Sequence, residues 1–431
     1  MWSCPNCGSW IFASRICPNC GAWVGDDSAD EQDSDHPVEL AIMGDTLLSC
    51  SGREAKVVVP AGVKELEEYS FYNDTALQEI ELPEDLTMIL KGAFQECTAL
   101  QEIRLPDKLK RLGRAAFYGW SALRKIEIPA SVKQINTETF RDCTALRVIE
   151  LSEGLEIIGG YVFEGCNALE KIVIPASVKQ IELEAFQDCT ALQEIRLPDG
   201  LELIGRSAFS ECEALQEIRL PDGLKEIGSD AFSGCRSLRQ ITVPVGVKCI
   251  ETAVFQSCRA LQEVHLPEGL EQIGMFAFED CDTLTRIVLP ASLKRLCRGA
   301  FENCTSLLEA QLPDGLEELQ DDAFEYCRSL QKVTIPAQVR QIEQAAFYYC
   351  QSLQEVQLPE ELNEIGEDAF AHCWALKRIV IPAGVEKVGE HAFWECYSLQ
   401  NIAVLSDDTE IAEDAFEDCP GTVKRGTGSL F

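Results

Sequence analysis

The sequence predicts a solenoid, an elongated fold made by stacking short repeats, with a small metal-binding module in front of it. Phenylalanine recurs every 23 residues, sixteen times from Phe71 to Phe416, with no insertion or deletion. A fixed period of this length is typical of repeat proteins, in which each unit packs on its neighbours. Two CPNCG units within the first 21 residues predict the separate module.

Four cysteines in residues 1–25 have the spacing of a structural zinc site. Cys4, Cys7, Cys17 and Cys20 form the two CPNCG knuckles, and four thiolates suit one tetrahedral Zn²⁺ ion. The segment resembles the short zinc ribbons found at the N-termini of many bacterial proteins. A redox dithiol would need a βαβ context, and rubredoxin-like iron sites place their knuckles much farther apart. We therefore predict a zinc ribbon that holds one structural zinc ion.

An acidic linker and a capping hairpin come next. Residues 26–37 carry six acids and no Lys or Arg, which predicts a solvated, flexible linker. Residues 38–59 contain two apolar runs on either side of Met43-Gly44-Asp45, which predicts a hairpin. A solenoid needs its first core face covered, so we expect this hairpin to be the N-terminal cap.

Residues 60–421 hold the sixteen repeats, and the stretch Phe209–Ala231 shows their pattern. Ile218 and Leu220 are two residues apart, which predicts a short strand over residues 217–220. Pro221 ends this strand because proline has no N–H to give to the sheet. Each repeat thus contributes one strand to a parallel sheet.

The rest of each repeat is expected to be irregular. Leu224 and Ile227 are three residues apart, which suits a bend or a second short extended segment. Residues 207–212 suit a single helical turn that points Phe209 and Cys212 inward. A cysteine recurs at the position of Cys212 in fourteen repeats, and we interpret it as a small apolar core filler rather than a soft-metal ligand. Residues 422–431 are expected to form a short C-terminal cap or tail.

These positions resemble a known repeat. Leu376–Pro382 and Val385–Gly389 fit the unit LxxIxIPxxVxxIGxxAFxxC of the BspA-like, Treponema-type leucine-rich repeats. The resemblance implies a right-handed leucine-rich-repeat solenoid with a parallel β-sheet on the concave face, and with short helical turns and irregular segments on the convex side. Members of the family are mostly interaction or adhesion modules, and many are secreted.

Charge and cysteine content favour a cytoplasmic protein. The formal net charge is −35, which opposes binding to nucleic-acid phosphates and favours solubility or a basic partner. The N-terminus does not read as a signal peptide, and no apolar run approaches the roughly 20 residues of a membrane span. The 21 cysteines suit a reducing compartment, because most of them occupy regular core positions.

Aromatic residues gather in four consecutive repeats near the C-terminus. Seven of them fall one to four residues after a repeat phenylalanine, so they should meet on one flank: Tyr326, Tyr348, Tyr349, His372, Trp374, Trp394 and Tyr397. Clustered exposed aromatics are typical of protein interfaces. The alternative is a partly buried ridge that stiffens the end of the solenoid.

The outward strand positions offer a second surface. Its charges nearly cancel and alternate in sign along the later repeats: Glu263, Arg286, Glu309, Lys332, Glu355 and Arg378. Neighbouring strands lie about 4.8 Å apart, so these charges can pair with one another, at under about 1 kcal/mol each. The alternative is a polar partner laid along this face.

The sequence favours a protein–protein interaction scaffold over an enzyme. It contains no catalytic motif, and the repeats lack the insertions with which loops shape a pocket. We therefore predict a cytoplasmic scaffold with a tethered zinc ribbon and a protein partner of unknown identity. A surface or secreted adhesin is the first alternative, and nucleic-acid binding led by the ribbon is the second.

Overall fold

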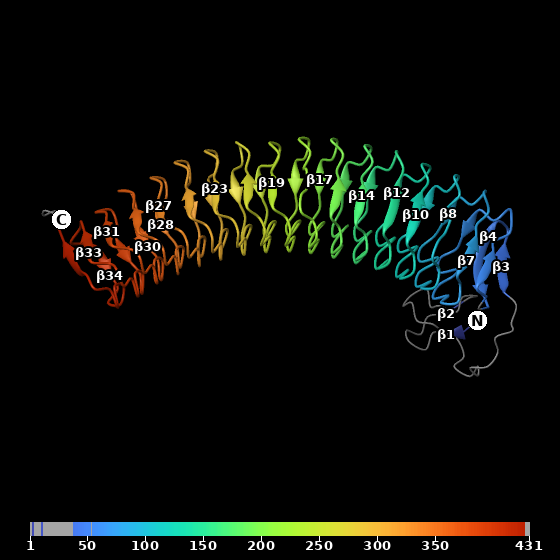
Figure 1. Ribbon diagram of the computed structural model, residues 1–431, viewed down its shortest axis with the longest axis horizontal. Helices are drawn as coiled ribbons and strands as arrows, with labels where there is room; N and C mark the ends of the chain where they lie inside the picture. Colours follow the sequence, from blue (N-terminus) through green and yellow to red (C-terminus); the bar gives the residue numbers. More distant parts are fainter. Residues whose placement is uncertain (1, 4–9, 12–37, 53, 427–431) are drawn as a thin grey trace.

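Each 23-residue repeat forms one turn of a solenoid, and the turns stack into a long arch (Figure 1). The computed structural model describes residues 2–3, 10–11, 38–52 and 54–426. Most turns contain two short strands, and each pairs in parallel with the strand 23 residues later. The strands therefore form two ladders along the arch, which we call the first ladder and the second ladder.

The two ladders contain nearly all of the strands. The first ladder consists of β5 (Lys56–Val58), β7 (Glu79–Glu81), β10 (Lys125–Ile128), β12 (Val148–Leu151), β14 (Lys171–Val173), β16 (Glu194–Arg196), β19 (Gln240–Thr242), β21 (Glu263–His265), β23 (Arg286–Val288), β25 (Glu309–Gln311), β27 (Lys332–Thr334), β29 (Glu355–Gln357), β31 (Arg378–Ile381), β33 (Asn401–Val404) and β35 (Thr422–Arg425). The second ladder consists of β6 (Glu65–Leu66), β8 (Met88–Ile89), β9 (Arg111–Leu112), β11 (Gln134–Ile135), β13 (Ile157–Ile158), β15 (Gln180–Ile181), β17 (Leu203–Ile204), β18 (Glu226–Ile227), β20 (Cys249–Ile250), β22 (Gln272–Ile273), β24 (Arg295–Leu296), β26 (Glu318–Leu319), β28 (Gln341–Ile342), β30 (Glu364–Ile365), β32 (Lys387–Val388) and β34 (Glu410–Ile411).

The alternation of side chains sets the register. In β14, Ile172 is buried while Lys171 and Val173 are exposed, as the twofold period of a strand requires. Ile172 pairs with Ile195 of β16, so equivalent residues of neighbouring turns stack on one another. A slip by one residue would expose the whole apolar set, and the exact 23-residue period therefore fixes the pairing.

In the repeat Phe209–Ala231, the second extended segment is present, whereas the expected first strand is reduced to a single bridge. Leu224 and Ile227 are buried, and Ile227 belongs to β18. Glu217 forms only an isolated bridge to Gln240 in place of the expected strand over residues 217–220. The turn at residues 101–106 likewise has no strand in the first ladder.

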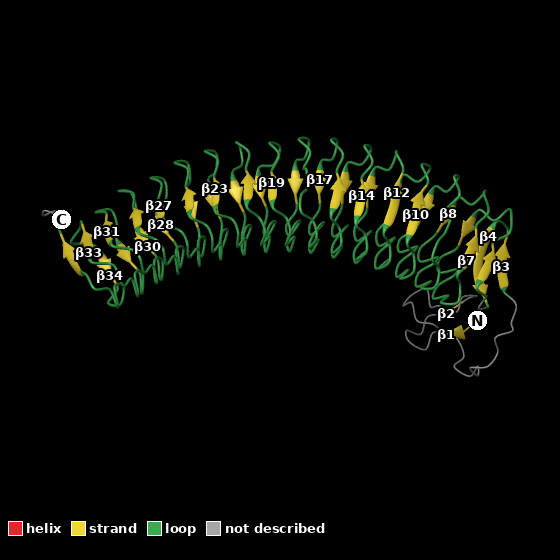
Figure 2. Cartoon of the chain, in the orientation of Figure 1, coloured by secondary structure: helices red, strands yellow, loops and turns green. Residues whose placement is uncertain are grey.

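The expected helical turn is wrong. Residues 205–211 form hydrogen-bonded turns, and Figure 2 shows strands and loops but no helix in the part of the chain that the structure describes. Ser207 and Glu211 have positive φ angles of 51° and 56°, which a right-handed helix does not allow. The equivalent positions of most other turns also have positive φ.

Hydrogen bonds between turns replace the helix. The N–H groups of Phe209 and Glu211 donate to the carbonyls of Ala231 and Ser233 in the next turn, at 2.8 and 2.7 Å. The intervening N–H of Ser210 donates locally to the Ser207 carbonyl at 3.1 Å. Half of the amides in this segment therefore join neighbouring turns, whereas a helix would use all of them internally.

The bend of the arch differs from the expected one. The arrowheads of β10, β12 and β14 point to the outer edge in Figure 1, so the loops that begin with the repeat proline lie there and the turns with the phenylalanine line the inner edge. The prediction that the parallel sheet lies on the concave side is therefore wrong, because the phenylalanine turns occupy that side. The phenylalanine turns are hydrogen-bonded to each other, whereas Leu224 N–H bonds within its own loop to the Pro221 carbonyl at 3.0 Å. We call the inner edge the turn edge.

Phenylalanine and cysteine fill the core behind this edge. The sixteen repeat phenylalanines form one continuous stack with ring centroids 4.9–5.9 Å apart. Each repeat cysteine donates its thiol to the carbonyl of the repeat phenylalanine in the preceding turn; for Cys212 and Phe186 the distance is 3.2 Å. We call the fourteen repeat cysteines the thiol ladder. In one of the two turns without this cysteine, Trp120 Nε1 donates to the Phe94 carbonyl instead. The cysteine is therefore a hydrogen-bond donor as well as a filler.

The two ends of the chain add short antiparallel and parallel pairs. β3 (Glu39–Met43) and β4 (Thr46–Ser51) form a hairpin, and β4 continues the second ladder by pairing with β6. At the other end β35 joins β33, so residues 422–425 extend the first ladder. β1 (Trp2–Ser3) pairs antiparallel with β2 (Trp10–Ile11). Cys4, Cys7, Cys17 and Cys20 lie outside the described residues.

Candidate protein-binding surface

The structure brings the seven predicted aromatic residues together on the turn edge. We call this group the aromatic ridge: Tyr326, Tyr348, Tyr349, His372, Trp374, Trp394 and Tyr397. Backbone hydrogen bonds align its turns, because Tyr326 N–H donates to the Tyr348 carbonyl and His372 N–H to the Trp394 carbonyl, both at 2.8 Å. The ridge follows from the 23-residue period, which places equivalent turn positions side by side.

Ring contacts run along the whole ridge without a gap. Tyr349 lies at the centre, with ring centroids 5.1 Å from Tyr326, 4.1 Å from His372 and 6.2 Å from Trp374. His372 contacts Trp394 at 4.6 Å, and Trp374 contacts Tyr397 at 6.4 Å. Such pairs contribute about 0.5–1.5 kcal/mol beyond the buried area, so the ridge is a preformed surface.

Exposure divides the ridge into a base and a platform. His372 is buried, and Tyr326, Tyr348, Tyr349 and Trp394 are half-buried, which agrees with the alternative of a stiffening ridge for these five. Trp374 and Tyr397 are 38% and 52% exposed. We call these two residues the platform. They are neighbours in adjacent turns, so the base fixes a pair of accessible aromatic rings.

Buried contacts fix the base of the ridge. His372 Nδ1 lies 2.9 Å from Glu395 Oε2, close enough for an ion pair, although the direction of approach is poor for a hydrogen bond. His391 Nε2 lies 3.3 Å from Asp414 Oδ2, and its ring packs 5.4 Å from Trp394. Both histidines thus have structural partners, which favours a supporting role over ligand binding.

The phenol groups of Tyr348 and Tyr397 remain protonated at neutral pH. A hydrogen bond to Glu395 is the main cause that raises the pKa of Tyr397 to about 12. Burial is the main cause that raises the pKa of Tyr348 to about 12. These two residues therefore present neutral aromatic rings with hydroxyl donors.

The ridge already holds one cation. The guanidinium carbon of Arg328 lies 5.7 Å from the ring centroid of Tyr326. This distance is typical of a cation–π contact, in which the negative face of the ring attracts the positive charge. The platform residues lie two and three turns farther along the same edge.

A row of carboxylates continues the ridge toward the N-terminus. Glu279, Glu302 and Glu325 each follow a repeat phenylalanine directly, as Tyr348 and Trp394 do in the ridge. Asn303 N–H donates to the Glu325 carbonyl at 2.7 Å, the same bond that links Tyr326 to Tyr348. We call these three residues the carboxylate row.

Burial, together with repulsion from neighbouring acids, disfavours the charged form of this row. Burial is the main cause that raises the pKa of Glu302 to about 7, and repulsion from Glu279 adds to it. Burial also raises the pKa of Glu325 to about 7, with repulsion from Asp322 as the next cause. Arg298 offsets part of the effect, but its Nε pairs with Asp322 Oδ2 at 2.9 Å. Sequence reasoning missed this row, although three glutamates at one repeat position were visible.

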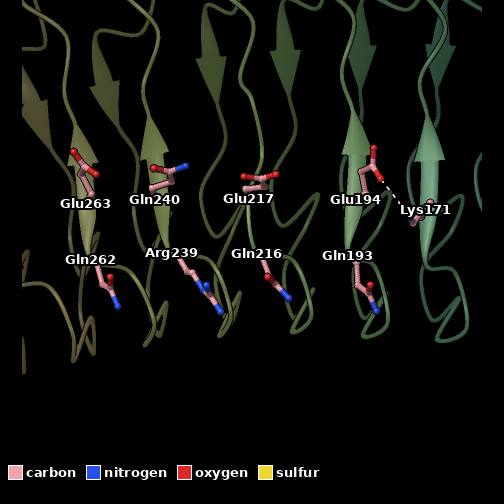
Figure 3. A pocket seen from close by; sticks show the side chains of 9 residues that line it. All are labelled: Lys171, Gln193, Glu194, Gln216, Glu217, Arg239, Gln240, Gln262 and Glu263. Carbon is pink, nitrogen blue, oxygen red and sulfur yellow. Dashed lines mark ion pairs between the residues drawn. The ribbon is translucent and has the colours of Figure 1, made fainter.

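The outward face of the first ladder has two open hollows. One occupies about 600 Å³, and Figure 3 shows its lining residues. Glu194 and Gln240 lie on strands, Glu217 lies between them, and Gln216 and Arg239 lie nearer the turns. The second occupies about 650 Å³ around Glu102. Both coincide with the turns that have no strand in this ladder.

Like charges explain the two interruptions. We compare the residues that stand eight positions after each repeat phenylalanine, from Glu79 to Asn401. Neighbouring turns carry the same charge there at Glu79–Glu102 and at Glu194–Glu217, and nowhere else in this range. Like charges directly opposite one another destabilise strand pairing. Glu194 instead pairs with Lys171 at 3.2 Å and with Arg196 of its own strand at 2.9 Å. The hollows are therefore local breaks in the ladder.

In the later repeats, charged side chains of this face form ion pairs with one another. Glu355 lies 3.5 Å from Lys332 and 3.4 Å from Arg378, and Arg286 lies 3.9 Å from Glu309. The expected self-pairing is thus confirmed for these residues, while Glu263 pairs with His265 of its own strand at 3.0 Å. A polar partner would have to break these pairs, which makes the aromatic ridge the better candidate.

Three properties of residues 38–52 and 54–426 concern metal binding, membrane crossing and thiol reactivity. No cluster of three or more His, Cys, Asp or Glu in the described part is arranged to hold a metal ion. No described helix has the length and hydrophobicity needed to cross a bilayer. Burial raises the pKa of Cys212 and of the other fully buried thiols well above the ordinary range, so these thiols are poor nucleophiles and poor ligands.

The fold and the ridge define the class of protein. Two parallel ladders of short strands, one phenylalanine per turn and an ordered surface edge make it a leucine-rich-repeat solenoid, a class that generally serves as a protein-binding scaffold. A family model described as BspA type leucine rich repeat region (6 copies) matches residues 64–193, 179–308 and 298–423. The chain belongs to the BspA-type leucine-rich repeat family.

Solved structures agree with this assignment. A leucine-rich repeat protein from Bacteroides ovatus is 31% identical with a TM-score of 0.66, over 74% of this chain and 82% of that chain. A leucine rich cell surface protein from Faecalibacterium prausnitzii is 28% identical with a TM-score of 0.52, over 77% of this chain and 96% of that chain. No curated protein sequence matches the chain.

Proposed function

We propose that this protein is a non-enzymatic protein–protein interaction scaffold whose contact surface is the aromatic ridge. The observation that carries the proposal is the platform, because Trp374 and Tyr397 are exposed side by side on a base of packed rings. Large aromatic side chains on a rigid support contribute much of the energy of protein interfaces at little entropic cost.

Affinity capture from the native cell tests this proposal. The bait is the full chain, either wild type or with Trp374→Ala and Tyr397→Ala together. These two side chains are exposed, so the variant keeps the base of the ridge. A control with Val173→Ala and Val288→Ala removes exposed apolar side chains from the first ladder. We expect specific partners to be lost from the ridge variant alone; equal recovery with both variants would contradict the proposal.

We further propose that the scaffold works in the cytoplasm and carries a zinc ribbon. The cysteines of the thiol ladder are free of disulfide bonds, which agrees with a reducing compartment. The antiparallel pair of β1 and β2 flanks residues 4–9 on both sides, as the hairpin of a zinc knuckle would. Arg15 is the only basic residue of residues 1–25 and the whole chain has a net charge of −35, so the ribbon is better suited to docking or capping than to binding nucleic acid.

Surface adhesion is the second candidate. It is supported by the cell surface protein from Faecalibacterium prausnitzii, which is 28% identical with a TM-score of 0.52. Cell fractionation combined with a thiol count separates the two candidates. A soluble intracellular fraction with reduced ladder cysteines would support the cytoplasmic scaffold, whereas recovery from the cell surface or medium would support the adhesin.

A further inference from the structure

We propose that the turn edge between Glu279 and Tyr397 binds a polypeptide segment rich in lysine or arginine. The aromatic platform would hold one cationic side chain by its ring faces, and the carboxylate row would hold others along the same edge. This inference rests on the proposed function and adds the chemical class of the partner.

The first argument is the continuity of the two groups. Glu302, Glu325 and Tyr348 occupy the same position in three consecutive turns, and backbone hydrogen bonds join those turns. Successive turns repeat at the ring spacing of about 5 Å seen in the phenylalanine stack, for example 5.4 Å between Phe301 and Phe324. An extended peptide advances about 3.3 Å per residue, so it can place side chains on several turns while it follows the edge.

The second argument is charge complementarity. Residues 321–420 carry twenty Asp and Glu against six Lys and Arg. On the turn edge itself, Glu302 and Glu325 lie in a row of like charges, where an incoming cation relieves repulsion in addition to forming its own contacts. An acidic or neutral peptide would gain neither effect.

The third argument is the existing contact of a cation with the ridge. Arg328 already lies over Tyr326 at 5.7 Å, so the ridge accepts a guanidinium within this chain. Trp374 and Tyr397 occupy the position of Arg328 two and three turns later, and these two residues are 38% and 52% exposed. Tryptophan gives the strongest cation–π contacts among the aromatic residues.

The binding test uses the full chain and a fluorescent peptide of alternating arginine and serine, with a glutamate–serine peptide as the charge control. Anisotropy titrations compare the wild type with three double variants: Trp374→Ala/Tyr397→Ala, Glu302→Gln/Glu325→Gln and Glu164→Gln/Glu184→Gln. The last pair removes the same net charge from half-buried glutamates of the turn edge far from the ridge. It therefore separates local binding from general attraction to an acidic protein.

We expect the first two variants to weaken binding of the arginine peptide by about fivefold to tenfold each. The Glu164→Gln/Glu184→Gln control should change it by less than about twofold, because distant surface charges are screened. Absence of arginine-peptide binding, equal weakening by both glutamate pairs, or full affinity of the platform variant would each overturn the proposal.

The pH dependence gives a second readout. Binding should tighten from pH 6 to pH 8 as Glu302 and Glu325 ionise, and Glu302→Gln/Glu325→Gln should remove this dependence. The charged groups that face the two glutamates are Glu279, Asp280, Arg298 and Asp322. A pH profile that is unchanged in the variant would contradict the role of the row.

The two proposals fail in different ways. If a cellular partner requires the platform but the arginine peptide does not bind, the scaffold function stands and the cationic class of partner is wrong. If the peptide binds at the platform while cellular partners are retained by the platform variant, the cationic site stands and the ridge is wrong as the scaffold's contact surface.

Discussion

The thiol of Cys212 donates a hydrogen bond to the backbone carbonyl of Phe186, 26 residues earlier, at 3.2 Å. The same hydrogen bond recurs along the thiol ladder, for example from Cys235 to Phe209 at 3.2 Å. It joins each turn to the one before it, next to the phenylalanine stack. A buried donor thus explains why the position needs more than a small apolar side chain.

Replacing Cys212 by valine should destabilise the protein by about 1 kcal/mol, because it removes one buried hydrogen bond while keeping an apolar filler. Urea unfolding followed by circular dichroism measures the effect. Cys297→Val is the control, since Cys297 is buried but lies outside the thiol ladder. Equal stability of the Cys212 variant and the wild type would show that the thiol acts only as a filler.

Native-state alkylation should modify Cys419 before the other cysteines of the thiol ladder. A hydrogen bond with Cys396 is the main cause that lowers the pKa of Cys419, and this cysteine is half-buried at the last turn. Burial raises the pKa of Cys212 and leaves little reactive thiolate. Mass spectrometry after limited iodoacetamide treatment at pH 8 measures the order, and similar rates for both thiols would contradict it.

Stability should fall as pH rises from about 4 to 7, partly because of Glu302 and Glu325. Their pKa values of about 7 in the folded protein exceed the value near 4.3 of an unfolded chain. The protonated form therefore favours folding below about pH 4, and this contribution is lost as pH rises through about 7. With allowance for solvent screening we expect about 1 kcal/mol per carboxyl group.

Glu302→Gln/Glu325→Gln should flatten this decline in a series of thermal melts. Glu202→Gln is the control, because its pairing with Lys225 lowers the pKa of Glu202 and gives the opposite sign at acidic pH. A decline of the same size in the Glu302→Gln/Glu325→Gln variant and the wild type would assign it to other groups.

Glu217→Lys should strengthen the first ladder at one of its interruptions. The lysine side chain would face Glu194 in the preceding turn and replace a pair of like charges by a pair of opposite charges. This should stabilise the strand pairing by up to about 1 kcal/mol. Hydrogen–deuterium exchange should show slower exchange of amides 217–219. Glu226→Lys in the second ladder is the matched control, and it should leave these amides unchanged.

Metal analysis should find one zinc ion per chain. Cys4→Ser/Cys17→Ser removes one ligand from each knuckle and should release the ion, because a structural site needs four thiolates. Cys249→Ser, in the second ladder, should keep it. Zinc that persists in the first variant, or a wild type without zinc, would remove the ribbon from the proposal.

The sequence alone determined the solenoid, because a 23-residue period with apolar residues at fixed places can bury them only by stacking one turn on the next. The same period predicted that the aromatic residues from Tyr326 to Tyr397 would meet on one flank. Residues that recur in register need no long-range information to be placed side by side.

Only the tertiary structure decided how each turn satisfies its backbone. The composition of residues 207–212 suits a helix, but hydrogen bonds to the next turn require positive φ at Ser207 and Glu211 and exclude one. Tertiary structure also divided the aromatic ridge into a buried base at His372 and an exposed platform at Trp374, because burial depends on how the turns pack around each side chain. The carboxylate row acquired its raised pKa values for the same reason.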